Sequence, residues 1–135
     1  MQSAADETVS SIIAKWSAGF NRLDANALSS LYSSNAFFFG SKSQLYRGNP
    51  GVAAYFNALP RWSAPTVRFT DRVTSQVNSD LINFAATATF VVDASTAPLS
   101  VKITWVIARE DGDWKIVSHH VSSRTPLLSE EPTAS

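Results

Sequence analysis

The feature that most constrains this chain is the alternation of apolar and polar residues in its second half. It runs through four segments, at residues 66–78, 81–93, 99–109 and 113–123. A period of two places alternate side chains on opposite faces of a β-strand. The segments are separated by short runs of turn-forming residues, such as 78–80 and 111–113, which favour antiparallel neighbours. We therefore predict a meander of four long strands.

The first half has helical periodicity instead. One amphipathic helix is expected between Ala5 and Phe20, and a second short helix should begin at an Asp24 cap and carry Leu28, Leu31 and Tyr32 on one side. Residues 33–35 should end that helix. A short buried strand at Phe37–Phe39 and another at Leu45–Arg47 should follow. The pair Asn49-Pro50, a capping residue before a proline, then predicts a third helix through Leu59.

Helices followed by antiparallel strands are typical of an α+β fold, in which the helices cover one face of the sheet. We predict three N-terminal helices packed on a strongly curved, mainly antiparallel sheet. The 135 residues suit a single domain, at 1–125, with a polar C-terminal tail at 126–135.

Composition excludes several classes of function. Eleven basic residues balance eleven acidic ones, so no net charge attracts nucleic acid. No apolar run approaches the roughly 20 residues needed to cross a bilayer, and no signal peptide is evident. There is no cysteine, no metal-ligand spacing and no nucleotide-binding motif. We expect a cytoplasmic protein with no cofactor, no metal, and neither nucleic acid nor membrane as a partner.

Large aromatic rings are unusually frequent for a thin core. A curved sheet around an apolar pocket would accommodate them, although the same rings could simply fill a solid interior. The candidates for contact with a small apolar ligand are Trp16, Phe20, Phe37, Phe39, Phe56, Trp62, Phe84, Phe90 and Trp105. Tyr32 and Tyr55 lie on apolar helix stripes and could add hydroxyl groups, with core packing as the alternative.

Several strings also resemble a known family over nearly the whole chain. Residues 16–24, Leu31-Tyr32, Gly48 and Tyr55-Phe56 are similar to the three-helix opening of the SnoaL-like group of the nuclear transport factor 2-like superfamily. Residues 105–122 resemble the final hairpin of SnoaL-like and kinase-association-domain proteins. The resemblance implies a cystatin-like, cone-shaped α+β barrel with a pocket, commonly paired into a homodimer through the sheet. It implies no single reaction, because the fold hosts isomerases, cyclases, dehydratases and noncatalytic assembly modules.

The two histidines, His119 and His120, are adjacent and should point to opposite faces of a strand. Alternation places Ser118 and His120 on the face of Ile116. The resemblance to the association-domain ending favours His120 as the cavity-facing residue, where it could act as a general acid or base. The alternative is a structural or interface histidine.

The superfamily resemblance also provides a test for ketosteroid isomerase chemistry, which uses a carboxylate base and two acidic oxyanion donors. Matching the strings places Gly40 at the base, Trp16 near the tyrosine donor and Trp105 near the acid donor. Indole groups cannot exchange a proton in this way, so that mechanism is not expected. Arg109 shares a face with Trp105 and is the best candidate to bind a ligand carboxylate.

Two hypotheses follow from the sequence. The first is a SnoaL-like small-molecule-binding protein, with the possibility of a cofactor-independent isomerase, cyclase or hydratase acting on an apolar cyclic substrate. The second is a noncatalytic dimerisation or assembly module of the same fold. Whether the protein is an enzyme stays open at this level.

Overall fold

The computed structural model describes residues 3–130, and within them three helices accompany one sheet. The helices are α1 (Ala4–Arg22), α2 (Ala25–Ser29) and α3 (Gly48–Asn57). The strands are β1 (Tyr32–Phe39), β2 (Tyr46–Arg47), β3 (Thr66–Asn78), β4 (Leu81–Val91), β5 (Leu99–Glu110) and β6 (Asp113–Ser123).

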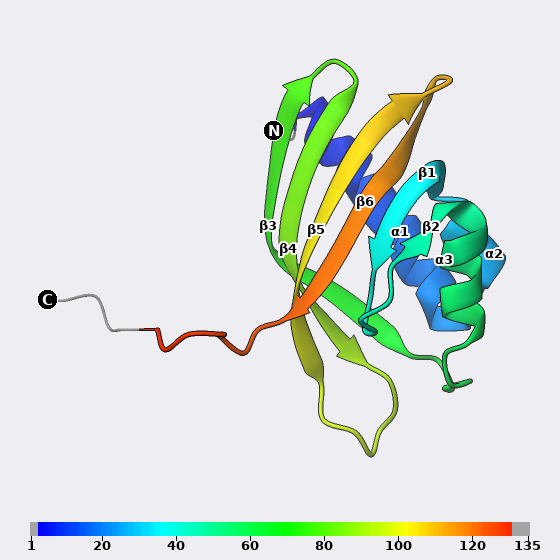
Figure 1. The fold of residues 1–135 in the computed structure, drawn as a ribbon, viewed down its shortest axis with the longest axis vertical. Coiled ribbons are helices and arrows are strands. Elements are labelled where there is room, and N and C mark those ends of the chain that lie inside the picture. The colour runs from blue at the N-terminus through cyan, green and yellow to red at the C-terminus, as the bar shows by residue number, and fades with distance from the viewer. Residues whose placement is uncertain (1–2, 131–135) are drawn as a thin grey trace, which may run out of the picture.

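The sheet has six strands in the order β2-β1-β6-β5-β4-β3. The predicted meander is confirmed, since β3, β4, β5 and β6 pair antiparallel in sequence order. β1 pairs parallel to β6 and antiparallel to β2, so the sheet is mixed. Figure 1 shows the strands curving, with the helices gathered on one side. The α+β architecture predicted from the sequence is therefore present, as a curved open sheet.

Helix α1 is fixed at both ends. The Ser3 hydroxyl accepts a hydrogen bond from the backbone N–H of Asp6 at 3.1 Å, and the Asp6 carboxylate accepts the Ser3 hydroxyl at 3.0 Å. At the other end Leu23 adopts a left-handed conformation with φ of 51°. The buried stripe of the helix lies along the sheet, where the Arg72 guanidinium of β3 donates to the Ser10 hydroxyl of α1 at 2.8 Å.

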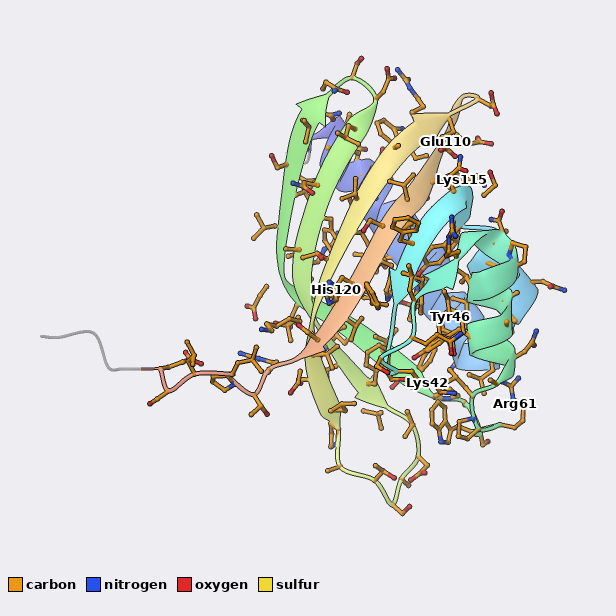
Figure 2. All side chains as sticks on the ribbon, in the orientation of Figure 1. Lys42, Tyr46, Arg61, Glu110, Lys115 and His120 are labelled. Atoms are coloured by element: carbon orange, nitrogen blue, oxygen red, sulfur yellow. The ribbon has the colours of Figure 1, made fainter. Side chains whose placement is uncertain are left out.

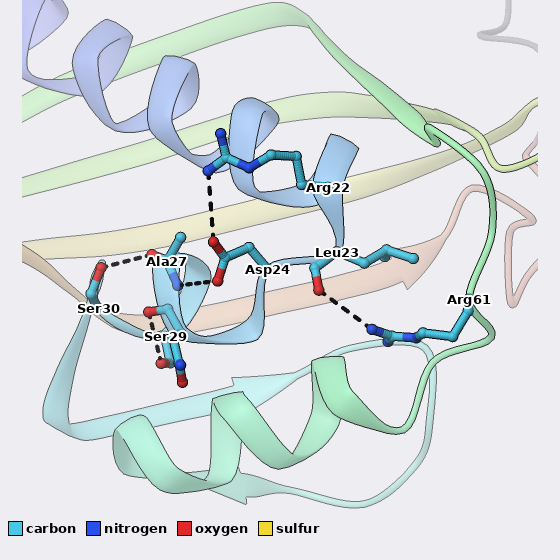
Figure 3. A network of polar contacts seen from close by, with 8 residues as sticks. Arg22, Leu23, Asp24, Ala27, Ser29, Ser30 and Arg61 are labelled. Carbon is cyan, nitrogen blue, oxygen red and sulfur yellow. Dashed lines mark hydrogen bonds and ion pairs between the residues drawn. The ribbon is translucent and has the colours of Figure 1, made fainter.

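Asp24 turns the chain from α1 into α2, as the sequence predicted (Figure 3). Its carboxylate accepts the backbone N–H of Ala27 at 3.0 Å and lies 3.7 Å from the Arg22 guanidinium. The Arg61 guanidinium donates to the Leu23 carbonyl at 3.4 Å, which ties the segment after α3 to this corner. Arg61 thereby links the corner between α1 and α2 to the segment that follows α3.

The start of α3 differs from the prediction, because Asn49 is not its cap. The helix begins at Gly48, whose φ is 68°, and a Cβ there would lie 2.8 Å from the Ser34 carbonyl oxygen. Glycine is therefore required at this position. The Asn49 amide instead donates to the Ser29 carbonyl at 3.0 Å and to the Tyr32 carbonyl. It links α3 to the end of α2 and the start of β1.

The residues expected to end the second helix belong to a strand. Tyr32 and residues 33–35 all lie in β1, so α2 ends earlier and β1 begins earlier than the sequence indicated. Parallel pairing with β6 explains the difference, since the backbone N–H of Ile116 donates to the Leu31 carbonyl at 2.9 Å. This long-range partner outweighs the local turn preference of the serines.

The largest fully buried side chains come from both halves of the chain and lie between the sheet and the helices; they include Trp105, Tyr32, Phe38 and Phe56. Within residues 3–130, every helix is too short or too polar to span a bilayer. Of the predicted tail, residues 126–130 contain neither helix nor strand, and residues 131–135 lie outside the described part of the chain.

A candidate ligand cavity under the helices

A cavity of about 510 Å³ opens between α1, α3, β1, the C-terminal ends of β4 and β6 and the N-terminal end of β5. This volume lies within the range of about 300–1,000 Å³ that is typical of small-molecule sites. Its walls are mostly aromatic and aliphatic. The lining residues are Trp16, Phe20, Phe38, Gly40, Ser41, Lys42, Ser43, Tyr55, Phe56, Leu59, Trp62, Phe90, Val92, Leu99, Val101, His119, Val121, Ser122 and Ser123.

A second depression, of about 690 Å³, lies where α1 meets the start of β6. Its lining carries acidic residues, such as Glu7 and Asp113, beside basic ones, such as Lys15 and Lys115. The Lys115 ammonium already donates to the Ser30 carbonyl at 2.8 Å. Because its charges are mixed and no buried titratable group enters it, we take the apolar cavity as the candidate site.

His119 is the polar centre of the apolar cavity and is only 3% exposed. Its Nδ1 lies 2.9 Å from Trp105 Nε1 and 2.8 Å from the Tyr32 hydroxyl. That hydroxyl in turn accepts the Trp16 indole N–H at 2.9 Å. The Phe38 ring stacks on the imidazole with centroids 4.0 Å apart. Four aromatic side chains thus hold one histidine in place.

These contacts define the protonation state of His119. An indole N–H can only donate, so the Nδ1 atom that receives the Trp105 N–H must present its lone pair. The proton of a neutral imidazole then lies on Nε2. Burial, together with the charge of His120, lowers the pKa of His119 to about 3, so the ring is neutral near pH 7. Burial also raises the pKa of the Tyr32 phenol, which keeps its proton.

The Nε2 atom of His119 faces the cavity. It makes no hydrogen bond within residues 3–130, whereas every fully buried side-chain nitrogen or oxygen there has a partner. Nε2 is therefore accessible, and His119 lines the cavity. The site thus presents a buried, neutral N–H donor in an apolar chamber, whose lining also carries the indole of the half-buried Trp62 and several serine hydroxyls.

The prediction that His120 faces the cavity is wrong, and a β-bulge explains why. Ile107 pairs with Ile116 but Val106 pairs with Ser118, so Val117 has no partner on β5. The extra residue reverses the alternation beyond it. His119 therefore joins Ile116 on the inner face, while His120 is exposed on the outer face of the sheet, where Figure 2 labels it on β6. Ser118 lies outside with it, and it does not line the cavity.

Two of the predicted phenylalanine contacts also lie on the outer face. Phe37 is 51% exposed and Phe39 is 37% exposed, whereas Phe38 between them is buried. Strand alternation counted from Ala36, which is buried, gives this result directly. Phe38, and not its neighbours, lines the cavity.

The remaining candidates divide between the cavity wall, the core and the surface. The prediction that Arg109 contacts the ligand is wrong. Arg109 is exposed at the C-terminal end of β5, where its guanidinium pairs with the Asp80 carboxylate at 2.8 Å. Tyr32, Phe84 and Trp105 are buried but do not line the cavity. The predicted residues that line it are Trp16, Phe20, Tyr55, Phe56, Trp62 and Phe90.

Tyr55 fixes the loop at the cavity mouth. Its hydroxyl accepts the backbone N–H of Ser41 at 2.9 Å and lies 2.6 Å from the Ser41 hydroxyl. A Cβ on Gly40 would lie 2.7 Å from the same Tyr55 hydroxyl oxygen. The close approach of loop and ring therefore needs glycine at that position.

Sequence reasoning missed His119, Phe38 and Lys42 as cavity residues. Alternation within β1 could have identified Phe38, while His119 required knowledge of the bulge. Lys42 lies in a serine-rich loop with no periodic signal. Within residues 3–130, no group of three or more His, Asp or Glu side chains is arranged to hold a metal ion.

Comparison with solved structures finds the same fold in bacterial proteins. A protein described as a calcium/calmodulin dependent protein kinase II association domain, from Xanthomonas campestris, has a TM-score of 0.81 at 20% identity, covering 94% of this chain and 91% of that one. An NTF2-like protein of unknown function from Pseudomonas putida has a TM-score of 0.79 at 15% identity, with coverages of 94% and 92%.

A third solved structure supports the fold by its description. It is an NTF2-like protein with a cystatin-like fold from Novosphingobium aromaticivorans, with a TM-score of 0.77 at 15% identity, covering 89% of this chain and 82% of that one. A search of curated proteins found no significant match. The profile of the SnoaL-like domain, by contrast, matches residues 9–126. The chain therefore belongs to the SnoaL-like domain family.

Proposed function

We propose that this protein binds a small, apolar ring compound that carries an oxygen acceptor, with the acceptor bound by the Nε2–H of His119. The observation that carries the proposal is the neutral, accessible Nε2 of a histidine whose other nitrogen is occupied. In an aromatic chamber, this buried donor favours a ligand with a matching acceptor, because an unpaired buried donor is costly.

The test compares two ligands that differ in the acceptor, 2-acetylnaphthalene and 2-ethylnaphthalene. Binding is followed by tryptophan fluorescence, since Trp16 and Trp62 line the cavity. We expect the ketone to bind about 2- to 12-fold more tightly, which corresponds to one neutral hydrogen bond of roughly 0.5–1.5 kcal/mol. Equal affinities, or no saturable binding of either compound, would contradict the proposal.

Two variants show which of the two histidines is responsible for the preference for the ketone. His119→Asn retains an acceptor for the Trp105 N–H. Its shorter side chain no longer brings an N–H donor to the position of Nε2, so the preference for the ketone should disappear. His120→Asn changes the exposed neighbour and should leave the preference unchanged. If the first variant does not fold, ¹⁵N NMR of the native protein gives the answer: the Nε2 resonance of His119 should shift with the ketone and not with the hydrocarbon.

A catalytic role would use the same donor. A neutral imidazole N–H can stabilise negative charge that develops on a carbonyl oxygen, as isomerisation, cyclisation or hydration of a cyclic substrate requires. Gly40, which the sequence comparison placed at the isomerase base, does line the cavity, and none of the described lining residues is Asp or Glu. Any reaction here would therefore proceed without a carboxylate base, and its rate should depend on His119.

The second candidate function is assembly through the outer face of the sheet. Phe37 and Phe39 are exposed there, and the His120 ring lies 5.4 Å from that of Phe39. Such a patch suits a homodimer. Sedimentation should show a dimer for the native protein and a monomer for Phe37→Glu, while Leu127→Glu, a change at an exposed residue outside the sheet, should remain dimeric. A monomeric native protein would contradict this candidate.

A further inference from the structure

The mouth of the cavity carries a single kind of charge. Among the described lining residues, Lys42 is the one charged side chain, and no carboxylate accompanies it. Lys42 is exposed and forms no ion pair within residues 3–130. Figure 2 shows it on the loop between β1 and β2, at the end of the molecule opposite Glu110 and Lys115.

The other basic residue labelled at this end is already engaged. The Arg61 guanidinium donates to the backbone carbonyls of Phe56 at 2.7 Å and Leu59 at 3.1 Å, and it does not line the cavity (Figure 2). Among the described lining residues, Lys42 is therefore the available cation, and Ser43 and Ser123, which are also exposed, line the cavity with it. An ammonium beside hydroxyl donors is a suitable setting for a carboxylate.

The cavity thus has polar groups in two distinct places. The His119 N–H lies among buried rings, Lys42 lies on the exposed loop between β1 and β2, and the apolar lining residues include Phe38, Phe56 and Leu59. Building on the function proposed above, we infer that the ligand is an anionic ring compound: an apolar ring body with an oxygen acceptor at the inner end and a carboxylate at the mouth, received by Lys42.

The experiment uses two probes of nearly the same shape, of which one is charged and one is neutral: 6-acetyl-2-naphthoate and its primary amide. Their affinities for the native protein are measured by isothermal titration calorimetry in 20 mM and 500 mM salt. At low salt we expect the carboxylate to bind about 2- to 5-fold more tightly than the amide, the range for one partly exposed ion pair. The preference should shrink at high salt, because the pair is screened there.

Two variants assign the effect to one residue. Lys42→Gln should remove the preference for the carboxylate and leave the affinity for the amide unchanged. Lys15→Gln makes the same change of charge on α1, at an exposed residue that does not line the cavity, and should retain the preference. Since both lysines are exposed, neither variant should unfold the protein.

The outcomes distinguish this inference from the proposal beneath it. If both probes bind with equal affinity and Lys42→Gln has no effect, the anionic ligand is refuted while the cavity remains a binding site. If 2-acetylnaphthalene binds but neither probe does, the inference alone is refuted; if none of the three compounds binds, both the inference and the proposed function are refuted. A preference for the amide, or a preference that Lys15→Gln removes as fully as Lys42→Gln, would also overturn the assignment to Lys42.

Discussion

The indole N–H of Trp105 points at Nδ1 of His119 across 2.9 Å, and both side chains are buried. Because the indole can only donate, this contact is compatible with a neutral ring protonated at Nε2 and incompatible with an imidazolium. A proton on Nδ1 would face the indole proton directly. The relationship between these two residues therefore sets both the donor offered to a ligand and the response of the fold to acid.

The first prediction concerns stability at low pH. The pKa of His119 is about 3 in the folded protein, where burial lowers it, and about 6.5 in an unfolded chain. Above pH 6.5 the ring is neutral in both states. Between pH 6.5 and 3 the unfolded chain binds a proton that the folded protein does not, so stability falls as pH falls, by up to about 1.4 kcal/mol per pH unit from this residue.

Urea unfolding of native protein and His119→Asn at several pH values measures this contribution. The asparagine keeps an acceptor for Trp105 but does not titrate, so the variant should lose less stability between pH 6 and pH 4 than the native protein does. His120→Asn is the matched control, because it preserves the buried ring and should retain the native slope. Parallel slopes for native protein and His119→Asn would contradict a neutral, buried His119.

The second prediction concerns the Tyr32 hydroxyl, which accepts the Trp16 N–H and contacts His119. Tyr32→Phe should cost about 1–3 kcal/mol of unfolding free energy, because it leaves a buried indole N–H without its acceptor. Trp16→Phe removes that donor. In a double-mutant cycle the two losses should add to more than the loss of the double variant, with a coupling of at least about 0.5 kcal/mol. Additive losses would show that the contact contributes nothing.

The third prediction concerns the loop at the cavity mouth. Tyr55→Phe removes the hydroxyl that holds Ser41, and we expect it to lower unfolding free energy by about 0.5–1.5 kcal/mol and to speed ligand release. Tyr46→Phe is the matched control: Tyr46 is half-buried, and within residues 3–130 its hydroxyl makes no hydrogen bond. Thermal melts and stopped-flow release rates compare the two variants. Equal effects would argue against a role for the Tyr55 hydroxyl.

Local signals in the sequence were sufficient for much of the fold. Period-two alternation ending at turn residues predicted β3 and β6 with the bounds that the structure has, Thr66–Asn78 and Asp113–Ser123. The Asp24 cap was predicted equally well, since a capping carboxylate contacts the backbone only three residues away.

What the sequence did not reveal depends on partners far along the chain. The serines after Tyr32 favour a turn, and only pairing with β6 makes them a strand. The alternation of inward and outward side chains along β6 reverses at Val117, and nothing in the residues of β6 alone marks that position. Because a one-residue shift reverses every side chain beyond it, the predicted site contained His120 in place of His119.

The last prediction follows from that bulge. Val117 is the unpaired residue, so a chain without it can keep the pairs Ile107 with Ile116 and Val106 with Ser118 in a regular ladder. His119 would still point inward in that ladder. We therefore expect the Val117 deletion to fold, with a loss of roughly 1–3 kcal/mol because strand twist and local packing change.

Deletion of Val106 on the facing strand is the matched comparison. It brings Trp105 and Ile107, which both point inward, into adjacent positions, where a strand cannot direct both to one face. That variant should not fold cooperatively. Circular dichroism melts of both deletions, with 2-acetylnaphthalene binding as a second readout, test the pair. If removing Val117 abolishes folding as fully as removing Val106, the expectation is wrong, and the bulge contributes more to the fold of β6 than a shift of register.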